Sequence, residues 1–191
     1  MKKRQKKVLV LLGSPRKKGN TALLAQQVAE GARSCGASVE TVFLHELEIK
    51  TCKSCYACQV PGSTGCAIDD GMQKLFPLML EADAWVLASP VYWFTMSAQL
   101  KLWMDRCFAL PAYAKDPFKG KKIAVAMAYG GEDPFDSGCV NALRTFQDAY
   151  GYAGAKIEGF VYGSAMKAGE IRKNKALMEA AVELGKKLAG D

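Results

Sequence analysis

Five short apolar runs alternate with segments of helical periodicity, and this alternation restricts the fold more than any other feature of the sequence. The first run, KKVLVLLG, is apolar without interruption, as is typical of a parallel strand covered on both faces. The other predicted strands are SVETVFL at 38–44, ADAWVLASP at 82–90, KKIAVAMAYGG at 121–131 and AKIEGFVYG at 155–163. This order predicts one α/β domain over residues 1–191, a doubly wound, five-stranded parallel sheet that binds ligands at the carboxyl ends of its strands.

The predicted helices lie between these strands. Helical periodicity covers 21–35, 97–108 and 139–152, and the last helix has an apolar stripe of Leu177, Ala181, Leu184 and Leu188. Apolar spacing from Met72 predicts a further helix, in which Pro77 should cause a distortion or an early stop. Four strand-end loops are then candidates for a binding site: 13–20, the cysteine-rich loop 52–66, 89–97 and 128–138.

The net charge of +7 is concentrated at the amino end. Five basic residues precede the first strand with no acidic residue among them: Lys2, Lys3, Arg4, Lys6 and Lys7. They are not interleaved with aromatic residues, so we predict a solvated tail and no nucleic-acid partner. The apolar part of this end, residues 8–12, is too short for a secretory signal, and no apolar run could cross a bilayer. We therefore expect a cytoplasmic protein with no membrane partner.

GSPRKKGNT, which joins the first strand to the first helix, has the composition of a phosphate site. Gly13 permits a tight exit from the strand, and Ser14 and Arg16 supply a hydroxyl and a charged fork. Asn20 and Thr21 stand where the helix begins with free backbone N–H groups, which suit a phosphate dianion. The loop is neither a Walker loop nor a GxGxxG motif. The alternative is a plain helix capped by Asn20.

The loop after the third predicted strand forms an aromatic turn where a core would not need one. Its residues are Pro90, Val91, Tyr92, Trp93 and Phe94. Such a flat surface suits a planar ring, which the backbone at Tyr129, Gly130 and Gly131 could approach closely, with N–H groups stabilising negative charge on it. Alternatively, the aromatic side chains close the end of the sheet or cover an oligomer interface.

These loops resemble those of the NADPH-dependent FMN reductase family and its iron-sulfur flavoprotein relatives. The GSPR and GNT sequences resemble the segment that holds the FMN phosphate, and SPVYWFTMSAQLKLWMDR resembles the turn over the flavin with its following helix. AYGGED resembles, more weakly, the glycine turn beside the flavin ring. The resemblance covers nearly the whole chain and implies a flavodoxin-like fold with strand order 2-1-3-4-5. It also implies FMN as cofactor, NAD(P)H as a candidate co-substrate, and homodimers or homotetramers with flavin sites near subunit contacts.

CKSCYACQVPGSTGC contains four of the seven cysteines: Cys52, Cys55, Cys58 and Cys66. Three thiolates at every third residue can converge on one side of a curled segment, and a flexible return can bring the fourth, which is the logic of a [4Fe-4S] site. A compact run of four cysteines also resembles the feature that separates iron-sulfur flavoproteins from plain FMN reductases. A zinc site remains open, although zinc more often uses two separate CxxC pairs. Disulfides are least expected in a reducing compartment.

We therefore predict an FMN-dependent oxidoreductase that moves electrons between a two-electron donor and a one-electron acceptor through FMN and a 4Fe-4S cluster. The flavin carries the chemistry, so no catalytic side chain is assigned. The alternatives are a cluster-free NAD(P)H-dependent FMN or quinone reductase and a zinc-stabilised basic binding module. Asp69 and Asp70 are expected to cap the following helix, and Cys35, Cys107 and Cys139 to be buried small hydrophobes.

Overall fold

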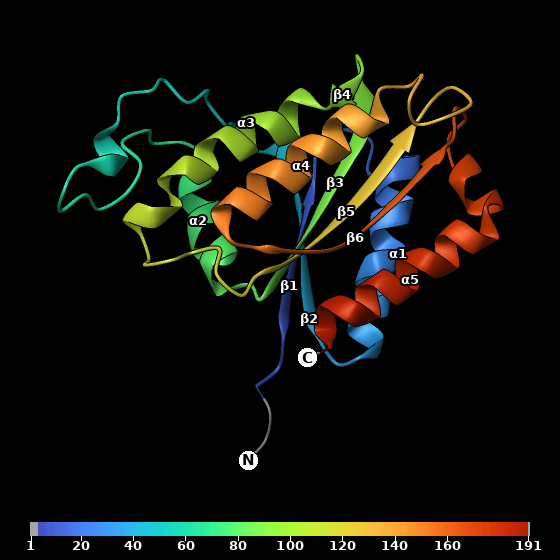
Figure 1. The fold of residues 1–191 in the computed structure, drawn as a ribbon, viewed down its shortest axis with the longest axis horizontal. Helices are drawn as coiled ribbons and strands as arrows, with labels where there is room; N and C mark the ends of the chain where they lie inside the picture. Colours follow the sequence, from blue (N-terminus) through green and yellow to red (C-terminus); the bar gives the residue numbers. More distant parts are fainter. Residues whose placement is uncertain (1–3, 191) are drawn as a thin grey trace.

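The structure, a computed structural model, describes residues 4–190 and has a central sheet of six strands within them. The parallel strands are β1 (Lys7–Leu12), β2 (Ser38–Phe43), β3 (Ala84–Tyr92), β5 (Lys122–Tyr129) and β6 (Lys156–Ser164). Their order, β2-β1-β3-β5-β6, is the predicted order 2-1-3-4-5 of the parallel strands (Figure 1). The sixth strand, β4 (Thr95–Met96), pairs antiparallel with the end of β3 and was not predicted.

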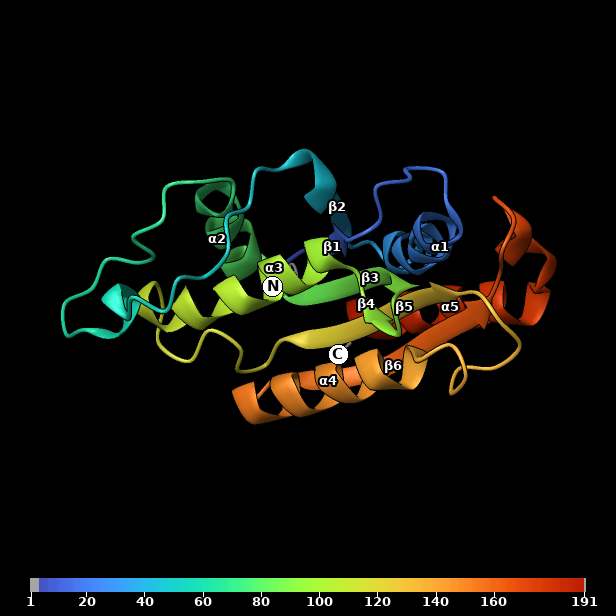
Figure 2. The ribbon, with the colours of Figure 1, turned by 90° about the horizontal axis from the view of Figure 1, so that it is seen from above.

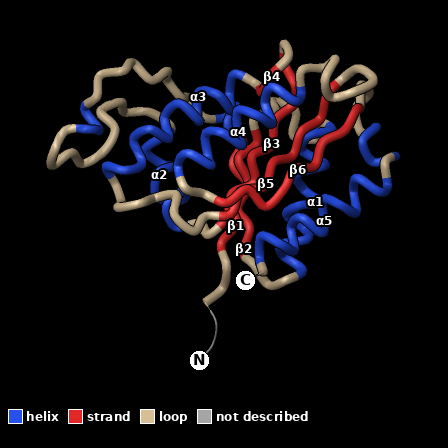
Figure 3. Tube along the Cα trace, viewed as in Figure 1, coloured by secondary structure: helices blue, strands red, loops and turns tan. Residues whose placement is uncertain are grey.

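Helices cover both faces of the sheet (Figure 2). One face carries α1 (Asn20–Ser34) and α5 (Lys175–Ala189), and the other carries α2 (Met72–Glu81), α3 (Ala98–Arg106) and α4 (Cys139–Ala153). Loops and short 3-10 turns join these elements, and the longest irregular stretch is the cysteine-rich loop between β2 and α2 (Figure 3). No helix within residues 4–190 has the length and apolar character needed to span a membrane.

Pro77 does not stop α2, so an early end of this helix, one of the two predicted outcomes, is wrong. The helix continues to Glu81, with Pro77 at its sixth position. Proline removes one backbone N–H from the helix. The buried side chains of Met72, Phe76 and Met79 hold α2 against the sheet on both sides of that position. Packing therefore outweighs the local preference of proline.

The two faces of the central strands differ in side-chain size. In β3, Trp85 and Leu87 point to the face covered by α2, α3 and α4, while Ala84 and Ala88 point to the face covered by α1 and α5. The large residues, with the indole ring of Trp103 from α3, fill the space between this face and its helices. Small residues on the other face allow α1 and α5 to lie close to the sheet and to each other.

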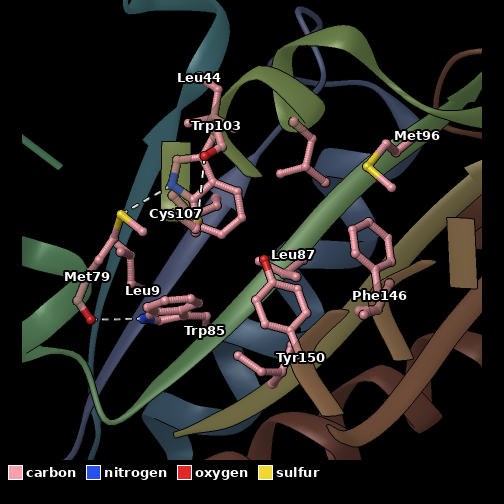
Figure 4. Close-up of a cluster of buried hydrophobic side chains, with 14 of the residues drawn as sticks. Leu9, Leu44, Met79, Trp85, Leu87, Met96, Trp103, Cys107, Phe146 and Tyr150 are labelled. Atoms are coloured by element: carbon pink, nitrogen blue, oxygen red, sulfur yellow. Dashed lines mark hydrogen bonds between the residues drawn. The ribbon is translucent and has the colours of Figure 1, made fainter. Parts of the chain in front are cut away.

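Large side chains fill the face below α2, α3 and α4, and the two tryptophans among them have partners for their indole N–H groups (Figure 4). The Trp85 indole Nε1 donates to the Met79 carbonyl at 3.1 Å, and Trp103 Nε1 lies 3.3 Å from the Met79 sulfur. The two indole rings meet edge to face, with their centroids 5.7 Å apart. Buried tryptophan needs such partners for its N–H group. This layer fixes the position of α3 against the sheet.

The basic amino end is more firmly attached than a solvated tail. Lys2 and Lys3 lie outside the described residues. Arg4 pairs with Asp83, and Lys7, the first residue of β1, pairs with Glu81 at 2.7 Å. Part of the positive charge is therefore neutralised at the amino edge of the sheet.

Candidate functional site

A cavity of about 150 Å³ opens at the carboxyl ends of β1, β3, β5 and β6, and is called here the strand-end cavity. Most of the predicted cofactor residues line it: Ser14, Arg16, Asn20, Thr21, Pro90, Val91, Tyr92, Tyr129 and Gly130. Trp93, Phe94 and Gly131 were predicted as well but do not line it. The sequence reasoning missed Gly19, Ala128 and three residues after β6: Ala165, Met166 and Ala168.

The amino end of α1 supplies the polar half of the strand-end cavity. Ser14 and Thr21 are buried polar residues in its wall, and the Ser14 hydroxyl accepts a hydrogen bond from the Arg16 backbone N–H at 3.2 Å. Gly19, and not Asn20, is the cap residue of α1, and no side chain caps the helix. The first N–H groups of a helix have no partner within it. This end of α1 can therefore donate to an anion, together with the Arg16 guanidinium.

Asn20 does not cap α1 but connects it to the segment after β6. Its amide Nδ2 donates to the carbonyls of Ala165 and Lys167 at 3.1 and 3.0 Å, and its Oδ1 accepts from the Ile171 backbone N–H at 3.3 Å. These three bonds fasten the segment after β6 to the amino end of α1. The alternative, a plain helix capped by Asn20, is therefore wrong, because the amide is already used on a segment about 150 residues away in sequence.

A hydrogen bond connects the loop after β1 to the beginning of α3. The Ser97 hydroxyl donates to the Gly13 carbonyl at 2.8 Å and accepts from the Leu100 backbone N–H at 3.3 Å, so it also caps α3. A Cβ at Gly13 would lie 2.6 Å from the Ser97 hydroxyl, so only glycine fits this approach. The first loop and the aromatic turn therefore have a fixed relative position.

The aromatic turn is the tip of the β3–β4 hairpin. Trp93 and Phe94 are the two residues between Tyr92 and Thr95, and both have positive φ. Trp93 is 92% exposed and Phe94 is 54% exposed, so the two side chains project into solvent next to Tyr92, which lines the cavity. The Phe94 carbonyl accepts from Asn141 Nδ2 at 3.0 Å, which anchors the tip to α4.

The segment after β6 forms a wall of the cavity opposite the hairpin. A Cβ at Gly130 would lie 2.3 Å from the Met166 sulfur, so Met166 packs directly on this glycine. The Ala165 backbone N–H donates to the Tyr129 carbonyl at 2.8 Å, and the Ser164 hydroxyl donates to the Gly131 carbonyl. Burial raises the pKa of the Tyr129 phenol, with smaller contributions from neighbouring acidic groups. Gly131, where a Cβ would meet nothing within 4 Å, leaves the backbone of this turn open to a planar ligand.

The cysteine-rich loop forms a second cavity, of about 420 Å³, called here the cysteine cavity. All four predicted ligands line it: Cys52, Cys55, Cys58 and Cys66. Ser54 and Tyr56 have positive φ and curl the loop between the first three cysteines. Within residues 4–190, however, no three His, Cys, Asp or Glu side chains are already close enough to hold a metal ion. The donor set fits a thiolate-bound metal or cluster, but the sulfur atoms do not converge as they stand.

Cys66 is held more tightly than the other three cysteines. Its backbone N–H donates to the Tyr113 hydroxyl at 3.0 Å, and its carbonyl accepts from Gln73 Nε2 at 3.0 Å. Gly65, with φ of +134°, precedes it, and a Cβ there would clash with the Tyr113 ring at 2.2 Å. Cys52 and Cys55 are exposed. The loop therefore holds Cys66 in a fixed position, called preset here, whereas the Cys52 and Cys55 thiols are open to solvent.

A buried ion pair lies beside Cys66. The side chains of Arg106 and Asp70 are 1% and 0% exposed and meet at 2.5 Å. Burial raises the pKa of the Asp70 carboxyl, but hydrogen bonds from Arg106 and from the backbone of Lys50 and Met72 outweigh it, and the pKa lies below its usual value. Asp70 does accept from the Met72 N–H at the start of α2, as expected for a cap, but pairing with Arg106 was not predicted.

The two cavities lie at opposite ends of α3. The cysteine cavity includes Asp105, Arg106, Phe108 and Ala109 at the carboxyl end, whereas the hairpin that borders the strand-end cavity leads into the amino end. Nine residues of helix span about 13 Å. Among residues 4–190, none lines both cavities. A ligand in each would therefore be separated by roughly the length of this helix.

The three cysteines outside the loop are not alike. Cys107 and Cys139 are buried, as predicted, and burial raises the pKa of both thiols, that of Cys139 to about 11. Cys35 is exposed, so the prediction that it is buried is wrong. It is the residue that follows the last turn of α1, where the helix leaves the core.

One protein family and several known proteins match this chain in sequence. The family described as NADPH-dependent FMN reductase matches residues 6–158. An iron-sulfur flavoprotein of Archaeoglobus fulgidus is 35% identical over 125 residues, which are 65% of this chain and 55% of that protein. An iron-sulfur flavoprotein of Methanocaldococcus jannaschii is 39% identical over 100 residues, which are 52% of this chain and 51% of that protein. The chain thus spans about half the length of these relatives.

Solved structures share the fold. An NAD(P)H:quinone oxidoreductase from Methanothermobacter marburgensis superposes with a TM-score of 0.73 at 18% identity, covering 98% of this chain and 99% of that one. At this identity the similarity establishes the architecture alone. It supports the flavodoxin-like fold class predicted from the sequence.

Proposed function

The chain belongs to the NADPH-dependent FMN reductase family, and we propose that it is an FMN-dependent oxidoreductase whose strand-end cavity holds FMN. The observation that carries this proposal is one cavity in which an uncapped helix end, an aromatic hairpin and a glycine turn meet at the carboxyl ends of the strands. When bound, FMN would supply the chemistry, because it takes up a hydride from a donor such as NAD(P)H and can release electrons one at a time.

The residues of the strand-end cavity divide into groups for the phosphate and for the ring. Ser14, Arg16 and Thr21, with the backbone at the start of α1, would bind the phosphate, and Asn20 would hold the opposite wall in place. The ring would lie against Pro90, Val91 and Tyr92, with Trp93 and Phe94 next to Tyr92. Tyr129, Gly130 and Gly131 would lie beside it. No catalytic side chain is assigned.

We further propose that Cys52, Cys55, Cys58 and Cys66 bind a 4Fe-4S cluster. Support comes from the four thiols around one cavity, the spacing of the first three, and the names of the two relatives. In the cytoplasm, reducing conditions would keep these thiols free to act as ligands. A bound cluster would give the protein a one-electron path, so that a two-electron donor could serve a one-electron acceptor.

The separation of the cysteine sulfurs favours a second candidate function. Within the described residues the sulfurs are not grouped as metal ligands, which is what a cluster-free NAD(P)H-dependent FMN or quinone reductase would show. In that protein the strand-end cavity would have the same role, and the cysteine-rich loop would be empty. The zinc-stabilised binding module gains no support from the strand-end cavity.

A homodimer or homotetramer is part of the proposal. Large apolar side chains are exposed around the strand-end cavity on three loops, at Trp93, Phe94, Phe135 and Met166. Exposed apolar patches of this kind mark association sites. Light scattering coupled to gel filtration should give a dimer or tetramer mass, and a monomer mass at micromolar concentration would contradict this part of the proposal.

Protein purified without oxygen tests the proposed cofactors. One sample should be analysed for its absorption spectrum, FMN, iron, acid-labile sulfide and zinc. Flavin bands with about four iron and four sulfide per chain would support both cofactors. Flavin without iron, in a protein that oxidises NAD(P)H, would select the cluster-free reductase. Zinc without flavin would overturn the proposal.

A further inference from the structure

Arg106 is a buried cation with one unused donor. Its Nη1 donates to Asp70 at 2.5 Å and to the Lys50 carbonyl at 2.8 Å, and its Nη2 lies 3.3 Å from the Cys66 sulfur. The Nε atom is also buried, yet it has no acceptor anywhere in residues 4–190. Buried N–H groups almost always have a partner. Arg106 also borders the cysteine cavity, where its Nη2 reaches the Cys66 sulfur.

The same guanidinium joins the two ends of the cysteine-rich loop. Lys50 precedes the first cysteine and Asp70 follows the last one, and both bond to Arg106. Lysine could not replace this arrangement, because a single ammonium group lacks the planar fork that reaches several acceptors at once. Nη2 also lies 3.2 Å from the second Asp70 oxygen and 3.5 Å from the Ile68 carbonyl. The pairing with Asp70 neutralises the charge, so the contact of Nη2 with the Cys66 sulfur serves as a directed hydrogen bond.

We propose that Arg106 is a positioning residue of the cysteine site: its Nη2 holds the Cys66 sulfur in place and stays hydrogen-bonded to that sulfur when it binds the cluster. This inference rests on the proposed function. Hydrogen bonds to the sulfurs of an iron-sulfur centre help to set its reduction potential. Reduction adds one electron and one negative charge to the centre without forming or breaking a bond, so an N–H donor stabilises the reduced state. Arg106 should therefore raise the potential.

The test compares Arg106→Lys with Arg144→Lys in the full chain. Lysine at 106 keeps the positive charge opposite Asp70 but removes the Nε donor and the second arm of the fork. Arg144 lies on α4, is 75% exposed and pairs with Asp148 at 2.7 Å, so its replacement controls for the same chemical change at a distant surface. Circular dichroism and thermal unfolding of the metal-free proteins show whether each variant is folded.

Two readouts are used besides activity. After reconstitution with iron and sulfide, a redox titration followed by electron paramagnetic resonance gives the potential of the centre. In Arg106→Lys the ratio of reduced to oxidised centre at a fixed potential should fall at least tenfold, a shift of about 59 mV for one electron. Titration of the metal-free proteins with Co²⁺, followed by thiolate charge-transfer absorption, should show at least tenfold weaker binding. Arg144→Lys should match the wild type in both.

Each outcome decides the inference. An unchanged potential together with unchanged Co²⁺ binding in folded Arg106→Lys overturns it, as does a wild-type chain that binds no Co²⁺ through thiolates. If the wild type takes up no iron but Arg106→Lys weakens Co²⁺ binding, the proposed cluster fails while the positioning role of Arg106 stands. If Arg106→Lys does not fold, Tyr113→Phe, which loses the hydroxyl on the Cys66 backbone N–H, replaces it in the Co²⁺ titration. Weaker Co²⁺ binding by Tyr113→Phe then supports the inference that Cys66 is held in position before the metal binds, and unchanged Co²⁺ binding contradicts it.

Discussion

Trp93 and Phe94 occupy successive left-handed backbone conformations, with φ of +46° and +66°, at the tip of the β3–β4 hairpin. A two-residue hairpin turn with positive φ at both positions is normally made by Asn-Gly. Bulky residues there are strained by roughly 1–2 kcal/mol each. Such strain next to a cavity is consistent with a binding role for the two aromatic side chains.

Replacing Trp93 and Phe94 together by Asn and Gly should stabilise the chain without FMN and weaken its binding of FMN. We expect the free energy of unfolding to rise by about 1–2 kcal/mol, because the new residues adopt positive φ without strain. Urea denaturation measures the stability, and flavin fluorescence quenching measures the binding. Tyr152→Asn, at a 96% exposed position on α4, is the control for loss of an exposed aromatic ring. Lower stability in the double variant would show that the turn is not strained.

Gly31 and Gly151 should respond in opposite ways to replacement by alanine, although both lie within helices. A Cβ at Gly31 in α1 would lie 2.0 Å from the Val182 carbonyl oxygen of α5, so the two helices would have to separate. A Cβ at Gly151 in α4 would meet nothing within 4 Å. We expect Gly31→Ala to lose roughly 1–3 kcal/mol of stability by overpacking and Gly151→Ala to gain about 0.5–1 kcal/mol.

Thermal and urea unfolding of the two glycine variants provide the comparison. A Gly31→Ala variant as stable as the wild type would mean that α1 and α5 are far enough apart at this crossing to accept a Cβ. Gly185→Ala, on the opposite side of the same crossing, should repeat the result, because its Cβ would lie 1.9 Å from the Val28 carbonyl oxygen.

The sequence was sufficient to predict the strand order and most of the strand-end cavity. The strands were predicted from uninterrupted apolar runs and the cavity from polar or aromatic residues directly after them, whereas the strand order was implied by the family resemblance. β3 extends two residues further than predicted, because Val91 and Tyr92 pair with Met96 and Thr95 of β4. The loop itself has no apolar alternation from which the two-residue strand β4 could be inferred.

Contacts between distant segments could not be predicted in this way. Arg106 and Asp70 are 36 residues apart in sequence, and nothing in a charged residue at the end of an amphipathic helix indicates that it is buried. Met166 and its neighbours form a cavity wall because the Asn20 side chain donates to the backbone carbonyls on either side of Met166, and no local motif indicates these bonds. Cys35 has the helical spacing of a core residue, but the helix ends one residue before it.

Asn20→Asp should loosen the wall formed by the segment after β6. A carboxylate cannot donate to the carbonyls of Ala165 and Lys167, and its charge opposes an anion at the amino end of α1. We expect a loss of about 1–3 kcal/mol in stability and a drop of roughly tenfold or more in affinity for FMN. Isothermal titration with FMN measures the affinity.

The control for this change is Asn174→Asp at the amino end of α5. Asn174 accepts from the Leu177 backbone N–H at 3.0 Å as a helix cap, and aspartate caps a helix equally well. The control variant should therefore keep the stability and FMN affinity of the wild type. Equal FMN affinity in Asn20→Asp would show that Asn20 neither holds the wall nor lies near the phosphate.

Lys121 should make stability depend on pH in the alkaline range. Its ammonium group donates to the Leu80 and Ala82 carbonyls at 3.1 and 2.5 Å, and burial lowers its pKa from 10.5 to about 8, partly offset by Asp83. Between these two values the unfolded chain holds the proton and the folded chain does not. Folding then releases a proton, so this residue adds stability as pH rises from about 8 to 10.5, on the order of 3 kcal/mol in all.

Comparison with Lys121→Met isolates this contribution, because buried thiols such as Cys107 and Cys139, whose pKa values are raised, change stability in the opposite direction over the same range. We expect the stability difference, wild type minus Lys121→Met, to increase with pH between 8 and 10.5 and to be constant below 7.5. Urea denaturation at half-unit pH steps measures it. A difference that stays constant across the whole range would mean that Lys121 keeps its proton when buried, held by the two carbonyls at the end of α2 and by the Trp85 ring 5.4 Å away.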